Sequence, residues 1–144
     1  MKIRKATRKD AKIIQELLNS NPNLRGSEAD KATKEDIKQF LTDNIHRVYV
    51  YEEDKKIAAV MVAQFFKTAK FIYLFYIAVD KNYQRKGIAT KLFNHLEGIA
   101  RKEGYYLIEL LAKEENSKMS QFMKKIKYSR GGKYRFYYKL LKWK

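Results

Sequence analysis

One stretch of the chain decides the fold, and it reads Ile77-Ala78-Val79-Asp80-Lys81-Asn82-Tyr83-Gln84-Arg85-Lys86-Gly87-Ile88-Ala89-Thr90-Lys91-Leu92. An uncharged strand over 71–79 leads through a polar loop into an amphipathic helix that begins at Ile88. The first backbone N–H groups of a helix have no intrahelical partner, and they carry the positive end of the helix dipole. This junction is therefore predicted to bind a phosphate.

The residues around the helix start suit an anion. Gly87 has no Cβ, so the backbone can approach a ligand closely and adopt a positive φ. Arg85 and Lys86 add positive charge, and Thr90 offers a hydroxyl. The alternative is that Gly87 only eases the turn and the basic pair is solvated surface. The uncharged strand before the loop favours the phosphate site.

Outward from the junction, the pattern predicts a mixed α/β (α+β) sheet. Capping signals at Thr7 and Thr33 begin two helices, the first over about 9–19. Strands are predicted at 3–6, 47–52, 57–66, 71–79, 105–111 and 134–141, a helix at 88–103 and a short helix near 116–126. The order is β-α-α-β-β-β-α-β-α-β, with helices on both faces. We expect the uncharged strand 71–79 to lie in the centre, and the stretch 19–31, with Pro22, to be a loop.

Composition limits the possible chemistry. The chain has 144 residues, which suits a single domain over 1–144, and 45% are apolar, enough to bury one core. Cysteine is absent, which excludes disulfides, cysteine-ligated zinc and a thiolate nucleophile. No apolar run approaches the ~20 residues of a membrane span, and the first residues lack the apolar segment of a signal peptide. We expect a cytoplasmic protein that does not contact the membrane.

The motif Gln84-Arg85-Lys86-Gly87-Ile88-Ala89 resembles the Q/R-x-x-G-x-G/A signature of the GNAT superfamily of N-acetyltransferases. Ile77–Val79 is similar to the end of the family's fourth strand. Asn116, with Phe122–Tyr128, is similar to its later N…F-Y-x-K-x-G-F segment. The resemblance implies a GNAT-like acyl-CoA N-acyltransferase fold, formed as one N-acetyltransferase domain.

The resemblance also implies a ligand and a reaction. Acetyl-CoA would enter a V-shaped opening between the fourth and fifth strands and act as co-substrate, without a metal. Its acetyl group would pass directly, within a ternary complex, to a primary amine: a protein N-terminus, a lysine or a small-molecule amine. The diphosphate would lie on the amides of Arg85 to Thr90, the pantetheine along the strand edge, and Asn116 near the same arm. The cofactor-binding residues are then Ile77, Ala78, Val79, Gln84, Arg85, Lys86, Gly87, Ile88, Ala89, Thr90 and Asn116.

The proton-transfer groups are harder to place. The family's usual general acid is a tyrosine, but Met123 stands at that position and has no proton to donate, while Lys127 replaces the motif's glycine. We predict Glu109 and Tyr73 as the catalytic residues. Glu109 lies in an apolar strand where burial would raise its pKa, or else it faces outward. A backbone N–H near Val79 would stabilise the carbonyl oxygen.

Two tyrosines and the two histidines are further candidates for a role in catalysis or metal binding. Tyr76 and Tyr128 are the other hydroxyls near the cleft, and a water chain could replace a base. His46 and His95 lack companions at metal-ligand spacing and are predicted to be surface residues.

The net charge is +16, and ten Lys and Arg residues but no acid fall within 118–144. This excess could steer acetyl-CoA, form a solvated surface, or bind RNA or the ribosome with help from aromatic residues. Polyamines and lysine-rich tails are disfavoured as acceptors. Three hypotheses follow: an active N-acetyltransferase, a catalytically weak acyl-CoA-binding module, or an RNA- or ribosome-associated basic protein. Each could be a monomer or a homodimer.

Overall fold

A computed structural model describes residues 1–20, 31–135, 137–139 and 141, and these belong to two units, Met1–Leu111 and Ala112–Lys144. The predicted loop over 19–31 lies mostly outside the described residues, because residues 21–30 are not among them. No helix in the described part of the chain is long and apolar enough to cross a membrane. The two units are described one after the other.

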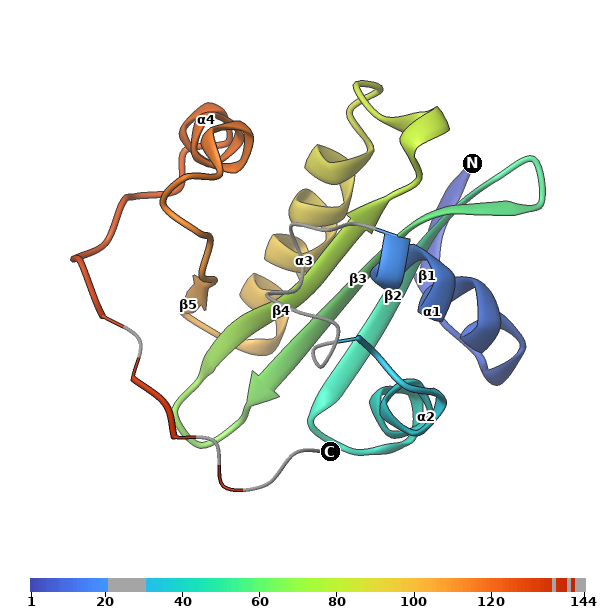
Figure 1. Ribbon diagram of the computed structural model, residues 1–144, viewed down its shortest axis with the longest axis horizontal. Coiled ribbons are helices and arrows are strands. Elements are labelled where there is room, and N and C mark those ends of the chain that lie inside the picture. The colour runs from blue at the N-terminus through green and yellow to red at the C-terminus, as the bar shows by residue number, and fades with distance from the viewer. Residues whose placement is uncertain (21–30, 136, 140, 142–144) are drawn as a thin grey trace. The chain divides into compact units, whose positions relative to one another are not determined.

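The first unit contains a five-stranded sheet with the strand order β1-β2-β3-β4-β5 (Figure 1). Its strands are β1 (Lys2–Lys5), β2 (His46–Glu53), β3 (Lys56–Phe66), β4 (Phe71–Val79) and β5 (Leu107–Glu109). The first three pairings are antiparallel and the pairing of β4 with β5 is parallel. The sheet is therefore mixed, as the sequence predicts.

The central strand of this sheet is β3, so the prediction that 71–79 is central was wrong. Residues 58–63 of β3 are all 0% exposed, whereas β4 is only partly buried and lies next to the short edge strand β5. The absence of charge misled the prediction. In β4 that absence reflects aromatic side chains, which can line a partly open surface as well as fill a core.

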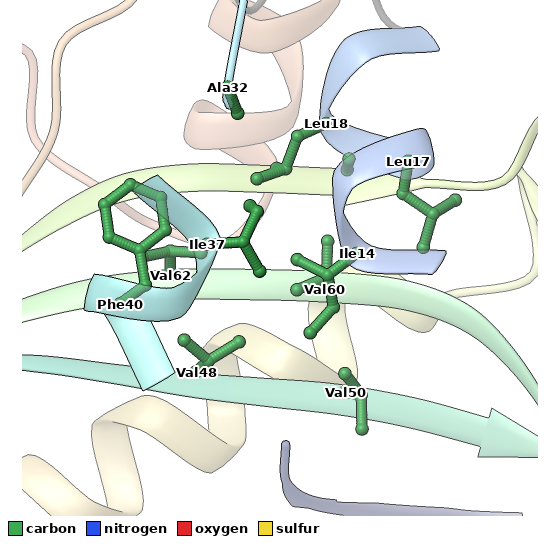
Figure 2. Packing of buried hydrophobic residues seen from close by; sticks show 11 residues of the cluster. Ile14, Leu17, Leu18, Ala32, Ile37, Phe40, Val48, Val50, Val60 and Val62 are labelled. Carbon is green, nitrogen blue, oxygen red and sulfur yellow. The ribbon is translucent and has the colours of Figure 1, made fainter. Parts of the chain in front are cut away.

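Helices cover both faces of the sheet, as predicted (Figure 1). Helices α1 (Ala11–Ser20) and α2 (Lys34–Thr42) pack on one face, and α3 (Ile88–Glu103) packs on the other. Figure 2 shows the core under α1 and α2, where side chains from both helices meet the valines of β2 and β3. The buried residues of α3 are Ile88, Leu92, Phe93, Leu96 and Ala100.

Local hydrogen bonds explain where these helices start. The backbone N–H of Thr7 donates to Asp10 Oδ2 at 2.7 Å in the 3₁₀ turn η1 (Arg8–Asp10) that precedes α1. At α2 the box is reciprocal, because Thr33 Oγ1 accepts from the N–H of Asp36 and Asp36 Oδ2 accepts from the N–H of Thr33. Both starts follow from the capping signals in the sequence.

The second unit contains helix α4 (Ser117–Lys125), whose N-cap is Asn116. The predicted strand 134–141 was wrong for the residues that are described. Residues 134, 135, 137–139 and 141 carry no strand, and the side chains of Tyr134 and Tyr137 are 90% and 84% exposed. Alternation of side chains gives a segment the two faces of a strand, but a strand also needs a neighbouring strand for its backbone hydrogen bonds. The described residues of this unit contain no such strand. Phe136 and Leu140 lie outside the described residues.

Candidate functional site

The loop between β4 and α3 is held in place by its own polar side chains. Asp80 Oδ1 accepts a hydrogen bond from the N–H of Asn82 at 2.8 Å and starts the 3₁₀ turn η4 (Lys81–Tyr83). Gln84 Nε2 donates to the carbonyl oxygen of Val79 at 3.1 Å. Gln84 therefore ties the loop back to the end of β4, a positioning role that the motif alone did not reveal.

Two residues with positive φ shape the chain before α3. Arg85 has a φ of 63°, and Gly87, the N-cap of α3, has a φ of 77°. A Cβ added at Gly87 would meet no atom within 4 Å, so the space above the backbone is open among the described residues. Left-handed residues in such a turn point successive N–H groups toward one side and form an anion-binding concavity. The predicted positive φ at Gly87 is confirmed.

The first turn of α3 presents amides that have no intrahelical partner. The first hydrogen bond of the helix runs from the N–H of Lys91 to the carbonyl oxygen of Gly87 at 3.1 Å, and no side chain caps this end. The N–H groups of residues 88–90 therefore have no partner within the helix. Ile88, only 3% exposed, anchors the turn to the core.

Charge adds to the field of the helix start. The side chains of Arg85 and Lys86 are exposed, and Lys86 Nζ lies 5.2 Å from the centre of the Tyr83 ring. The helix dipole and these two cations act in the same direction. The arrangement can hold a group with two or more negative charges, such as a diphosphate.

The edge of β4 beside this loop is open beyond Tyr73. Strand β5 pairs with β4 only over Phe71–Tyr73, so residues 74–79 have no strand partner on that side in the described part of the first unit. The N–H of Asp80 donates to Ala58 on β3, and backbone groups alternate between the two edges of a strand. The N–H and C=O groups of Ile77 and Val79 therefore point to the open edge, where an extended ligand could add as a further strand.

A bulge in β4 lies at the same place. Val62 pairs with Tyr76 but Ala63 pairs with Leu74, so Phe75 is the extra residue. The Phe75 side chain is 38% exposed and its ring lies 5.8 Å from that of Phe40. The sequence does not predict this bulge, because a run that is apolar at every position gives no sign of a slip in register.

Tyr73 and Glu109, the predicted catalytic pair, are register partners on β4 and β5. They form the last pair before the two strands part, and register partners share a face of the sheet. Tyr73 is half-buried, and its pKa is raised by burial and further by the negative charge of Glu109. Of the two alternatives for Glu109, a buried or an outward-facing position, the structure shows the second, because β5 has only three residues at the sheet edge and leaves that side chain exposed.

The remaining predicted groups lie in the second unit. Asn116 Oδ1 accepts a hydrogen bond from the N–H of Met119 at 3.2 Å and caps α4. Met123 is half-buried on the same helix. Asn116 therefore has a structural task in its own unit, which leaves its amide N–H groups for other partners.

The two histidines lie on different elements, and the structure describes the surroundings of both. In the described residues no three His, Asp or Glu side chains are grouped so that they could hold a metal ion. His95 does not lie on the outer surface as predicted: it is half-buried, its ring lies 5.1 Å from that of Tyr49, and burial lowers its pKa. His46 is also half-buried, beside Phe40, and hydrogen-bonds to Asp43 and Gln64.

Comparison with known proteins gives a consistent result. Residues 11–128 match the model of the acetyltransferase (GNAT) family. The structure of AAC(6')-Iy in complex with a CoA-containing bisubstrate analogue is 15% identical, with a TM-score of 0.81 over 96% of this chain and 97% of that one. The aminoglycoside 6'-N-acetyltransferase AAC(6')-IG from Acinetobacter haemolyticus is 19% identical, with a TM-score of 0.80 over 99% of this chain and 100% of that one.

A third similar structure is the ribosomal-protein-S18-alanine N-acetyltransferase from Escherichia coli. It is 19% identical, with a TM-score of 0.73 over 87% of this chain and 75% of that one. At these identities the three structures establish a shared fold.

Proposed function

The chain belongs to the acetyltransferase (GNAT) family, and from this premise we propose that it transfers the acetyl group of acetyl-CoA to a primary amine in a ternary complex. The observation that carries the proposal is the set of amides without an intrahelical partner at the start of α3, beside the open edge of β4 in the described part of the first unit. Acetyl-CoA combines a diphosphate with an extended amide-containing arm, so its two parts suit these two features.

We assign the binding contacts as follows. The amides of residues 85–90 hold the diphosphate, with Arg85 and Lys86 adding charge. The N–H and C=O groups of Ile77 and the N–H of Val79 bind the pantetheine amides along the open edge, flanking Ala78, while the carbonyl oxygen of Val79 accepts from Gln84. A contact of Asn116 with the same arm stays a prediction from the family resemblance. Gly87 supports the assignment, because the space that its Cβ would fill is open.

The chemistry needs an electrophile held in place and two proton transfers. The amine nitrogen attacks the thioester carbon, a C–N bond forms, and the C–S bond breaks. Negative charge develops on the carbonyl oxygen and calls for a hydrogen-bond donor, but the N–H of Val79 lies roughly 20 Å along β4 from Tyr73, so it binds the pantetheine arm and not this oxygen. Glu109 accepts the proton of the amine. Tyr73, kept protonated by its raised pKa, donates a proton to the leaving thiolate.

The positive charge of the protein indicates which class of amine it accepts. Similar structures are described as aminoglycoside or ribosomal-protein-alanine acetyltransferases, so both kinds of amine belong in a test. The net charge of +16 repels polycations over the distance of a Debye length. We therefore propose that a molecule with one amine and no other positive charge, such as a peptide N-terminus, is a better acceptor at low salt than sisomicin, which is bound in one of the similar aminoglycoside acetyltransferase structures.

Release of CoA thiol from acetyl-CoA tests the proposal directly. Because the chain has no cysteine, a thiol reagent detects only the released CoA. The panel contains a peptide with an N-terminal alanine, a peptide with one internal lysine and a blocked N-terminus, sisomicin, and buffer alone. The proposal expects amine-dependent release above the buffer rate. Acetyl-CoA binding without release from any amine would instead indicate a catalytically weak binding module.

A further inference from the structure

A row of polar residues crosses the sheet on the face that α1 and α2 cover. His46 on β2 pairs with Gln64 on β3, and Gln64 pairs with Tyr73 on β4. Tyr73 pairs in turn with Glu109. The neighbouring row on this face contains Val48 and Val62, so the polar row is an exception on an otherwise apolar surface. It ends at the point where β4 and β5 part.

Hydrogen bonds fix one end of this row. His46 Nδ1 lies 2.6 Å from Asp43 Oδ2, and Asp43 Oδ1 accepts from the backbone N–H of His46 at 2.7 Å. Burial acts to raise the pKa of Asp43, but the hydrogen bonds from His46 and Ile45 outweigh it, so this pKa lies below its usual value. Asp43 is therefore a carboxylate that only accepts, and Nδ1 of His46 must donate.

The state of the imidazole then decides how the Gln64 amide is oriented. Gln64 Nε2 lies 3.0 Å from His46 Nε2, and because an amide nitrogen only donates, this geometry requires a ring with its proton on Nδ1 and a lone pair on Nε2. An amide nitrogen donates, so this contact fixes the nitrogen of Gln64 toward β2. The amide carbonyl Oε1 is left without a protein donor among the described residues. The rings of Phe40 and Phe75 pack against His46 and bring no competing donor.

We propose that Gln64 Oε1 accepts a hydrogen bond from the incoming amine, and that Asp43 and His46 are positioning residues that hold the amide in this orientation. The inference rests on the proposed function. It extends that function, because it assigns part of the acceptor subsite to β2 and β3 rather than to the family's signature motif. The site would take a primary amine with an N–H directed at the pair formed by Tyr73 and Glu109.

The orientation can be tested without any turnover. Long-range proton–nitrogen correlation spectra of the ¹⁵N-labelled full chain report which ring nitrogen of a histidine carries the proton. His46→Phe assigns the signals, since only His95 then remains. We expect a proton on Nδ1 of His46 and none on Nε2. A proton on Nε2, alone or together with one on Nδ1, would require Gln64 to turn its oxygen toward His46, and would overturn the proposal.

The role in acceptor binding is tested by a double-mutant cycle, with the panel amine that releases thiol fastest. Gln64→Leu removes both amide groups at similar volume, and we expect the KM for that amine to rise roughly ten-fold or more. The KM for acetyl-CoA should stay within about two-fold. Gln39→Leu, at an exposed glutamine of α2, is the matched control and should change neither constant.

His46→Phe keeps a ring between Phe40 and Phe75 but removes both side-chain hydrogen bonds. We expect a several-fold rise in the KM for the amine. If His46 acts through Gln64, the double variant is no worse than Gln64→Leu alone. Additive effects, or an unchanged amine KM in Gln64→Leu, would show that the three residues only fasten the end of α2 to the sheet.

Failure of the proposed function gives a different result. If the wild-type enzyme binds acetyl-CoA but releases no thiol, calorimetric binding of the panel amines to the CoA-loaded enzyme replaces KM. Equal amine affinity in the wild type and Gln64→Leu, or no amine binding at all, then overturns the inference. Weaker binding in Gln64→Leu supports it, while the absence of transfer contradicts the proposed function alone.

Discussion

Replacing Gly87 by glutamate tests whether the start of α3 binds the diphosphate of acetyl-CoA, and the chain supplies its own control. Gly87 and Gly104 lie at opposite ends of α3 with φ values of 77° and 81°. A Cβ added at either position meets no atom within 4 Å. Any side chain at either site therefore costs backbone strain of about 1–2 kcal/mol but no steric clash. Gly87→Ala and Gly104→Ala should lower the free energy of unfolding by similar amounts.

A negative charge should weaken acetyl-CoA binding at position 87 but not at position 104. A carboxylate at position 87 would lie within roughly 4–6 Å of a bound diphosphate. Coulomb's law for a partly exposed pair then gives a repulsion of about 1–3 kcal/mol. This corresponds to a roughly 5- to 150-fold rise in the Kd for acetyl-CoA. Gly104→Glu places the same charge at the far end of the helix and should leave the Kd within about two-fold of its Gly104→Ala counterpart.

Calorimetric titration with acetyl-CoA gives the Kd, and urea unfolding gives the stability of each variant. The reasoning would be refuted by a Gly87→Glu variant that is folded and binds acetyl-CoA as tightly as Gly87→Ala. Equal weakening by Gly104→Glu would refute it as well, because the effect would then come from a general loss of structure. High salt should shrink the difference between the two glutamate variants.

Three further predictions follow from the same structure. Arg4 donates two hydrogen bonds to the buried carboxylate of Asp10 at 2.8 and 3.1 Å, and these hold the pKa of Asp10 below its usual value. The contact therefore adds to the free energy of unfolding above about pH 4, and this contribution is lost as the pH falls through the lowered pKa. Arg4→Met should cost about 1–3 kcal/mol at pH 7 and flatten the acid limb of the unfolding free energy, and an unchanged limb would contradict the assignment. Tyr73→Phe should lower kcat by about 10²-fold with little change in the KM for acetyl-CoA, whereas Tyr106→Phe, at an exposed tyrosine, should leave thiol release unaltered. Leu92→Ala, at a 0% exposed position of α3, should cost about 2–5 kcal/mol in urea unfolding, and a loss below 1 kcal/mol would place that helix face outside the core.

The parts of the fold that the sequence predicted are those governed by local chemistry. The capping boxes at Thr7 and Thr33, the stripe of α3 and the glycine that ends it act over a few residues, and each is found where it was expected. The turn at Gly87 belongs to the same class, because a positive φ before a helix strongly favours glycine. The start of α3 could be predicted as an anion site for this reason.

The features that escaped prediction depend on partners far along the chain. The bulge at Phe75 arises from the register of β3 against β4, which an uninterrupted apolar run cannot reveal. The shortness of β5 decides between the two alternatives for Glu109 and leaves it exposed, and the contact of His46 with Gln64 joins residues 18 positions apart on two strands. The alternating residues after Tyr134 show that a local pattern can also predict too much. The described residues of this segment form no strand, because their unit offers no second strand to pair with among the described residues.

A crystal structure of the full chain with CoA is the most direct test of the central claim. The account predicts diphosphate oxygens within hydrogen-bond distance of the N–H groups of Ile88, Ala89 and Thr90, with the pantetheine paired to the open edge of β4 at Ile77 and Val79. A structure in which CoA binds elsewhere, while these amides contact water or protein side chains, would contradict the account.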